Sequence, residues 1–271
     1  MTDCPAREVP PCPWSPVPIA GSGRGSASAG PQARTVTLAV GHLSLIAGGM
    51  DSQDVDEARA VPATPPEVAC LVRLALVEGH LIAARSLHRA GKTDAALRLA
   101  GDAEAGVVNC LGPALRAHGA PGLLPELGAF SRDIMNGVAP EGVTARLTDL
   151  WGAIQAAAAL TPATPTMRLE AVARMIRVAA DTYGKAMEDG EVVDSTSWHA
   201  ASAFFFVARE QALVLAASCD RAIVPAAARV LSALEETESL FGDGSTPRDG
   251  DIGVLLAAAT QVDFITARLR R

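Results

Sequence analysis

Apolar residues recur at the period of an α-helix almost without interruption from Pro65 onward, and this pattern limits the possible folds more than any other feature. The clearest case is the stretch 166–188, where one helical face carries only apolar side chains. These are Leu169, Val172, Ile176, Ala179, Tyr183 and Met187. Steps of three and four residues bring side chains to one face of a helix. The pattern predicts an all-α fold and disfavours the strand-based folds that bind nucleotides.

The core of such a fold must be built mainly from aliphatic side chains. Hydrophobic residues make up 49% of the chain, with alanine prominent, whereas aromatic residues make up only 4%. This composition favours helices in close contact over sheets. The net charge of −7 offers no general attraction to a phosphate backbone, so we expect no nucleic-acid partner.

Residues 1–62 differ sharply in composition from the rest of the chain. Prolines crowd the first part, and small residues fill positions 21–30. Such a segment cannot bury a core, and we predict a disordered tail. The apolar stretch 36–48 within it is too short to span a bilayer and matches the apolar region of a secretory signal, which leads to the hypothesis that the true start lies after Met1. Residues 63–271 then form a single helical-bundle domain with no transmembrane segment.

Glycine and proline divide this domain into about seven to nine helices. We predict helices at 66–90 with Thr64 as the cap, from 93 onward, in shorter pieces between 106 and 137, and at 141–160, 166–188, 196–218, 221–241 and 252–269. The first two resemble one hairpin of a helical repeat protein. No second copy follows at a fixed period, so a multi-helix bundle is the preferred architecture over a solenoid.

Two helices carry patterns that predict their surroundings. In helix 66–90 the charged residues Glu67, Glu78, Arg85 and Arg89 share one stripe and apolar residues fill the rest, which predicts burial on most sides. In helix 196–218 the consecutive residues 204–206 are all phenylalanine, and successive side chains point about 100° apart. Their rings cannot share one face, so this helix should lie at the centre of the bundle.

Helix 166–188 also carries charges opposite its apolar face. Glu170 and Arg174 are four residues apart, and so are Arg177 and Asp181. Residues at this spacing are neighbours on a helix surface. We therefore expect two ion pairs within this helix.

Cysteines and acidic loops give no sign of a metal motif. The five cysteines are scattered, odd in number and without the two-residue spacing of zinc or redox motifs, so we expect no disulfide scaffold and interpret Cys70, Cys110 and Cys219 as small buried hydrophobic residues. The acidic runs 243–245 and 249–251 lack the ligand pattern of a calcium loop. They are interpreted as a turn and a helix cap.

No catalytic triad, paired-carboxylate site or zincin helix is present, and the sequence does not indicate an enzyme. The residues most able to bind a ligand are His80, Tyr183 and His199. Each also has a structural interpretation. His80 fits a boundary histidine, His199 an aromatic cluster at the end of the bundle, and Tyr183 a buried hydroxyl bonded to a backbone carbonyl.

Helix topology decides whether these three residues can meet. Tyr183 lies near the end of its helix and His199 near the start of the next. If the two helices are antiparallel neighbours, both side chains come to one end of the bundle. Spacing does not establish whether His80 joins them. A set of three ligands suits an exchangeable metal, with water completing the shell, better than structural zinc, which takes four.

The stretch from Tyr183 to Asp194, followed by Trp198 and Phe204, resembles a motif in the extracytoplasmic helical regions of bacterial FTR1-like iron permeases and related secreted bundles. There a tyrosine helix ends in an acidic residue and glycine. The segment 79–81, followed by Gly91 and Ala95, also resembles the first hairpin of such proteins. Ser197 and Trp198 stand where the motif carries Glu-Tyr.

The resemblance implies a bacterial periplasmic protein that handles iron, another metal or a haem-type ligand, with His80, Tyr183 and His199 as the binding residues. Without the resemblance, a cytoplasmic location is the default. The alternative is a non-catalytic helical scaffold or adaptor that contacts another protein, which the lack of a dense ligand cluster favours. Both functions stay open at this point.

Overall fold

The computed structural model describes residues 64–107 and 123–269, and the remainder of the chain lies outside the described residues. The helices of residues 65–269 belong to one compact unit, and the predicted all-α fold is confirmed. The disordered tail, the apolar stretch 36–48 and the boundary near residue 62 fall outside the described residues and stay predictions.

The helices follow the sequence pattern closely over most of their length. The described helices are α2 (Pro66–Arg89), α3 (Thr93–Gly106), α5 (Leu123–Met135), α6 (Pro140–Leu160), α7 (Pro165–Ala186), α8 (Ser195–Ala216), α9 (Val224–Leu234), α10 (Glu238–Phe241) and α11 (Ile252–Leu269). Between α7 and α8 the two-residue strands β1 (Met187–Glu188) and β2 (Glu191–Val192) pair antiparallel.

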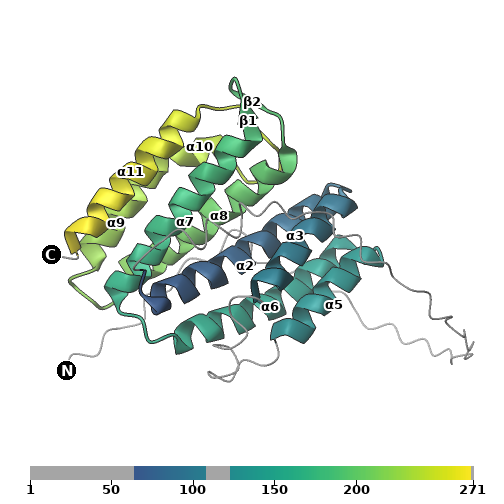
Figure 1. The fold of residues 1–271 in the computed structure, drawn as a ribbon, viewed down its shortest axis with the longest axis horizontal. Coiled ribbons are helices and arrows are strands. Elements are labelled where there is room, and N and C mark those ends of the chain that lie inside the picture. The colour runs from purple at the N-terminus through teal and green to yellow at the C-terminus, as the bar shows by residue number, and fades with distance from the viewer. Residues whose placement is uncertain (1–63, 108–122, 270–271) are drawn as a thin grey trace, which may run out of the picture. The chain divides into compact units, whose positions relative to one another are not determined.

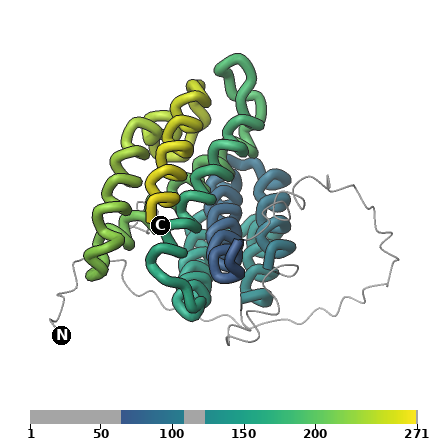
Figure 2. The backbone as a smooth tube through the Cα atoms, turned by 60° about the vertical axis from the view of Figure 1, so that its left-hand side comes forward, coloured from purple at the N-terminus to yellow at the C-terminus, as the bar shows by residue number. Residues whose placement is uncertain are grey.

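Three helices, α2, α7 and α8, contact one another and form the centre of the bundle (Figure 1). Helices α3, α5 and α6 pack on the side of α2, whereas α9 and α11 pack on the side of α7 and α8 (Figure 2). Phe204, Phe205 and Phe206 of α8 are 3%, 0% and 8% exposed. The central placement that their sequence predicts is confirmed.

Two predicted helix ends are wrong. Thr64 does not cap α2, because Pro65 occupies the cap position and the Thr64 hydroxyl has no hydrogen-bond partner. Helix α7 ends at Ala186, before the predicted end at residue 188, because Asp189 and Gly190 both adopt positive φ and turn the chain into the hairpin. An Asp-Gly pair is typical of such a tight two-residue turn.

The predicted helix 221–241 is also wrong as one continuous element. It divides into α9, a 3₁₀ turn (Glu235–Thr237) and α10. At the break, the Thr237 hydroxyl donates to the Leu234 carbonyl at 2.6 Å. A side chain that bonds the nearby backbone competes with the helical ladder, and a short 3₁₀ turn accommodates the change. After the break, Phe241 at the end of α10 is fully buried.

The middle of the charged stripe of α2 does not lie at the surface, although Arg89 at its end is exposed. Glu78 is 7% exposed and Arg85 is 3% exposed, because α6 covers the face where Glu78 lies. The Glu78 carboxylate accepts hydrogen bonds from Trp151 Nε1 at 2.7 Å and from Gln155 Nε2 at 3.0 Å, both on α6. Burial of α2 therefore extends beyond the sides that the sequence pattern indicated.

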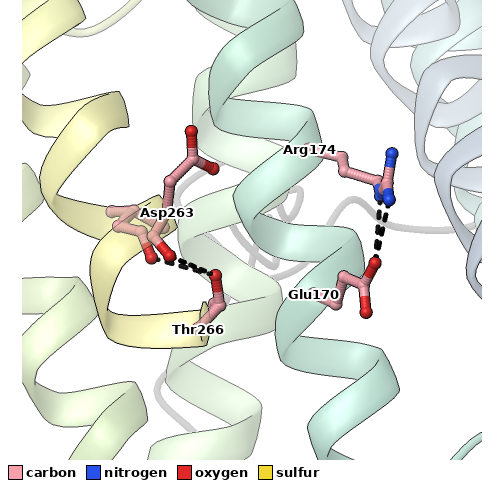
Figure 3. Close-up of polar contacts among 5 residues, drawn as sticks. Glu170, Arg174, Asp263 and Thr266 are labelled. Carbon is pink, nitrogen blue, oxygen red and sulfur yellow. Dashed lines mark hydrogen bonds and ion pairs between the residues drawn. The ribbon is translucent and has the colours of Figure 1, made fainter. Parts of the chain in front are cut away.

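One of the two expected ion pairs on α7 forms. Glu170 and Arg174 lie 2.9 Å apart (Figure 3), although Glu170 is only 6% exposed. Arg177 pairs with Asp263 of α11 and not with Asp181. A partner from a neighbouring helix replaces the one within the helix, which periodicity alone could not show.

The cysteine interpretation needs one correction. Cys219 lies exposed in the turn after α8 and is disulfide-bonded. Cys70 is a free, half-buried thiol that packs against the core. The interpretation of Cys219 as a small buried hydrophobic residue was therefore wrong, whereas Cys110 lies outside the described residues.

Candidate functional site

A cluster of aromatic rings fills the end of the bundle where α7 and α8 are joined. We call it the aromatic cluster. Phe241 is at its centre, with ring centroids 5.4 Å from Tyr183, 6.0 Å from Trp198 and 5.0 Å from Phe205. His199 contacts Trp198 at 5.3 Å between centroids. The structure therefore brings Tyr183 and His199 to one cluster, linked through Phe241 and Trp198.

The start of α8 is fixed by a local cap. The Asp194 carboxylate accepts from Thr196 N at 2.8 Å and from the Ser197 hydroxyl at 2.6 Å. Acceptors at this position satisfy the first backbone donors of a helix. The cap sets where α8 begins, and Trp198 and His199 in its first turn consequently point into the core, where both are almost fully buried.

The loop 242–251 covers the aromatic cluster and is bound to the hairpin. Gly250 N donates to the Gly190 carbonyl at 3.2 Å, and Val192 N donates to Asp249 at 3.2 Å. A Cβ atom on Gly250 would come 2.7 Å from the Tyr183 hydroxyl. Only glycine leaves room for the tyrosine beneath the loop.

Three buried polar atoms of this region have no hydrogen-bond partner in the described part of the chain: Tyr183 Oη, Trp198 Nε1 and His199 Nδ1. Buried polar groups are nearly always satisfied. Burial lowers the pKa of His199, nearby Lys92 lowers it further, and a hydrogen bond with the backbone of Gly244 opposes the shift, so the surroundings favour the neutral imidazole. Burial raises the pKa of Tyr183, and Asp249 and Asp251 add to the effect. Neutral donors and acceptors are thus concentrated at this end of the bundle.

His80 lies elsewhere on the molecule. Its ring packs edge-on against Phe204 at 5.0 Å between centroids. No ring contact ties it to Phe241 or to Trp198 among the described residues. Of the three residues proposed from the sequence, two share the aromatic cluster, and His80 is half-buried and packs on Phe204.

Metal ligands do not gather anywhere in the described residues: no group of three or more His, Cys, Asp or Glu side chains could hold an ion there. The acidic loop residues have local roles. Asp243 accepts from Ser245 N at 3.0 Å, and Asp251 accepts from Gly253 N at 2.7 Å. Their interpretation as turn and helix cap is confirmed.

A surface hollow of about 350 Å³ lies beside the hairpin. Its lining residues are Gly184, Met187, Asp189, Gly190, Gly250, Asp251 and Ile252. Tyr183 lies directly beneath Gly250, but His199 does not line the hollow. Neither histidine proposed from the sequence lines this hollow.

Glu78 forms a second unusual site that the sequence pattern did not single out. The pKa of its carboxyl is raised from 4.5 to about 7, chiefly by burial and also by the nearby Glu210 of α8, and the hydrogen bonds from Trp151 and Gln155 oppose the shift. A carboxyl that titrates near neutral pH is a common feature of functional sites, although structural networks produce it too. The signal that could have revealed it is a charged residue in a helix otherwise expected to be buried.

Helix α11 presents an apolar face to solvent. Phe264 is 68% exposed and Leu256 is 37% exposed. Its mean hydropathy of 1.4 over 18 residues would be enough to cross a membrane, but buried core helices of soluble proteins share this property. Asp263 of the same helix pairs with Arg177, which attaches one side of α11 to α7 and leaves the other side uncovered.

Comparison of the chain with protein-family models, curated proteins and solved structures finds no match. The resemblance to the extracytoplasmic regions of iron permeases therefore stays a prediction.

Proposed function

We propose that this protein is a non-catalytic helical scaffold that binds another polypeptide through the exposed apolar face of α11. The observation that carries the proposal is the pair Leu256 and Phe264. These two large apolar side chains are eight residues apart, which places them about 80° apart on the helix, and both are exposed. Contiguous exposed apolar surface marks interaction sites more often than isolated apolar residues do.

Other exposed apolar residues do not form such a face. Trp151 and Leu160 are both exposed on α6, but nine residues separate them and they point to opposite sides. Met135, Val193 and Val214 are each the only large exposed apolar residue of their own segment in the described part of the chain. The apolar face of α11 is therefore the best candidate for a docking surface.

Site-specific photo-crosslinking in the native cells tests this function. The photoreactive residue p-benzoylphenylalanine replaces Phe264 in the full chain, and a matched control carries it at Val214, which is 55% exposed on α8. We expect a defined polypeptide adduct from position 264 that is absent from position 214. Equal adducts at both positions, or none at 264, would contradict the proposal.

Ligand binding at the aromatic cluster is a second candidate function, supported by the three buried polar atoms without partners. The candidate ligands are iron, another metal or haem, with Tyr183 and His199 as contacts. Because the loop 242–251 covers both side chains, binding requires this loop to open. Metal analysis and an absorption spectrum of chelator-free protein test it. His199→Ala and Tyr183→Phe should each lower the amount of bound metal or haem while helical content is preserved. If the wild type and both variants all lack bound metal and haem, the result counts against this function.

A further inference from the structure

We propose that the polypeptide bound by α11 is a second copy of this chain, with the two α11 helices antiparallel across a two-fold axis close to Thr260. This inference rests on the proposed function of the α11 face and adds the identity of the partner. It follows from the order of side chains along the exposed face, from the charges at its two ends and from its extent.

Thr260 lies midway around the helix between Leu256 and Phe264, the two large exposed side chains of the face. Successive residues of a helix turn by about 100°. Relative to Thr260, five exposed residues of α11 consequently fall within an arc of about 80°. They are Leu256, Ala267, Thr260, Gly253 and Phe264. None of them is charged, and the exposed polar residues Gln261 and Arg268 lie at one edge of the arc.

The order of these residues is self-complementary. A two-fold axis at Thr260 pairs Leu256 of one copy with Phe264 of the other, and it pairs Gly253 with Ala267. Large side chains thus meet large ones, and small residues meet small ones. Gly253, Thr260 and Ala267 recur at seven-residue intervals, which is the repeat that keeps one seam of a helix facing its partner. An interface around a two-fold axis requires this kind of self-matching surface.

The charges at the two ends of α11 favour the antiparallel direction. Asp249 and Asp251 are exposed just before the helix begins, and Arg268 is exposed in its last turn. In the antiparallel pair the end of α11 that carries Arg268 lies beside the end of the other copy that Asp249 and Asp251 precede. A parallel pair would place like charges side by side. Opposed helix dipoles favour the same arrangement.

The extent of the face predicts a dimer of moderate strength. Helix α11 has 18 residues and is about 27 Å long. Pairing along one such helix buries roughly 1,000 Å², the lower end of the range for specific interfaces. We therefore expect monomer and dimer to be in equilibrium, with a dissociation constant in the micromolar range.

Sedimentation velocity of the full chain between about 1 and 100 µM tests the pairing. The wild type should shift from monomer to dimer across this range. Phe264→Glu should remain a monomer at the highest concentration, since each copy would bury a charge against Leu256. Val214→Glu is the matched control, because Val214 is similarly exposed on α8, and it should dimerise as the wild type does. Circular dichroism checks that both variants keep their helical content.

A charge exchange tests the antiparallel register. Arg268→Glu and Asp251→Arg should each weaken the dimer several-fold, because each places like charges together at both ends of the interface. Asp251 also accepts from Gly253 N, so the unfolding midpoint of Asp251→Arg is measured alongside. The double variant should recover most of the wild-type affinity. A double variant that binds more weakly than both single variants would overturn the register.

The outcomes separate this inference from the function on which it rests. A wild type that stays monomeric at about 100 µM overturns pairing with a second copy. If position 264 still yields an adduct with a different protein, the scaffold function stands and only the partner is wrong. If that adduct is absent as well, both proposals fail.

Discussion

Helices α8 and α11 have similar compositions and opposite environments. Each carries two residues of the Asp, Glu, Lys and Arg types, Arg209 and Glu210 on α8 and Asp263 and Arg268 on α11. Yet Phe205 of α8 is 0% exposed, whereas Phe264 of α11 is 68% exposed. A low charge content therefore does not distinguish a core helix from one that offers an apolar face to solvent.

The difference lies in how many neighbours surround each helix. Helix α8 packs against α2, α7 and α9, whereas α11 packs against α7 and α9. Apolar side chains on all sides of α8 leave water and stabilise the fold. On α11 the inner face stabilises the fold, and the outer face is left for association. The variants below test this division of roles.

Truncation of a phenylalanine in the two helices should have the largest and most unequal effect. Phe205→Ala removes a fully buried ring in contact with Phe241, and buried phenylalanine truncations cost about 3 to 5 kcal/mol. Phe264→Ala should change the free energy of unfolding by about 0.5 kcal/mol or less. Urea unfolding of monomeric protein, at low concentration, measures both. Similar costs for the two variants would remove the distinction between the helices.

The next effect on stability comes from the buried carboxyl of Glu78 on α2, which hydrogen-bonds to Trp151 and Gln155 of α6. In the folded state the pKa of Glu78 is about 7, above its ordinary value of 4.5, so the folded protein holds the proton more tightly than the unfolded chain does. The contribution of the protonated carboxyl is complete below pH 4.5 and is lost as the pH rises through 7. The difference between the two pKa values corresponds to about 3 kcal/mol at most.

Glu78→Gln should remove this loss of stability, since an amide has nearly the same shape and does not ionise. We expect the variant to match the wild type near pH 4.5 and to exceed its free energy of unfolding by up to about 3 kcal/mol at pH 8. Urea unfolding at several pH values measures the difference. If the two stability curves ran parallel from pH 4.5 to 8, the carboxyl would not titrate as its burial implies.

Features that depend on residues close together in the sequence could be predicted, whereas features that depend on contacts between distant segments could not. The centrality of α8 was predictable, because three consecutive rings at positions 204–206 cannot share a face. The placement of Tyr183 and His199 at one end of the bundle followed from two adjacent helices joined by a short hairpin. The burial of Glu78 could not be predicted, because it depends on α6, more than 70 residues away along the chain. The Arg177 partner on α11 escaped prediction for the same reason.

The break at Thr237 shows another limit. Residues 221–241 keep an apolar helical pattern, and the interruption arises from a side-chain hydroxyl that bonds the backbone. Because threonine occurs in many uninterrupted helices, the sequence did not reveal the break. Phe241 follows this break and lies at the centre of the aromatic cluster, so the sequence indicated an aromatic cluster near His199 but not its central ring.

The close contact between α2 and α8 predicts a smaller change in the free energy of unfolding, which a substitution of Gly79 tests. A Cβ atom on Gly79 would lie 2.4 Å from Phe204 Cδ1, so Gly79→Ala must displace a buried ring. Overpacking of this kind costs about 1 to 3 kcal/mol, partly offset by the better helix propensity of alanine, about 1 kcal/mol. We expect a net loss of about 1 kcal/mol in the free energy of unfolding.

The matched control for this variant is Gly101→Ala on α3, where no atom lies within 4 Å of the added methyl group. There only the helix propensity acts, and the variant should be more stable than the wild type by up to about 1 kcal/mol. Thermal or urea unfolding gives both values. Stabilisation by both substitutions would show that Phe204 moves aside without cost and that α2 and α8 are less tightly packed than the structure indicates.

The ion pair that joins α11 to α7 should contribute least. Arg177 and Asp263 are each more than 40% exposed, so water screens their attraction, and exposed pairs contribute about 0.2 to 1 kcal/mol. A double-mutant cycle with Arg177→Ala and Asp263→Ala isolates the coupling from other effects of each substitution. The cycle is measured by urea unfolding at low and at high salt, and the coupling should shrink with salt. A coupling well above 1 kcal/mol that salt does not reduce would mean that polar contacts, and not the apolar inner face, attach α11 to the bundle.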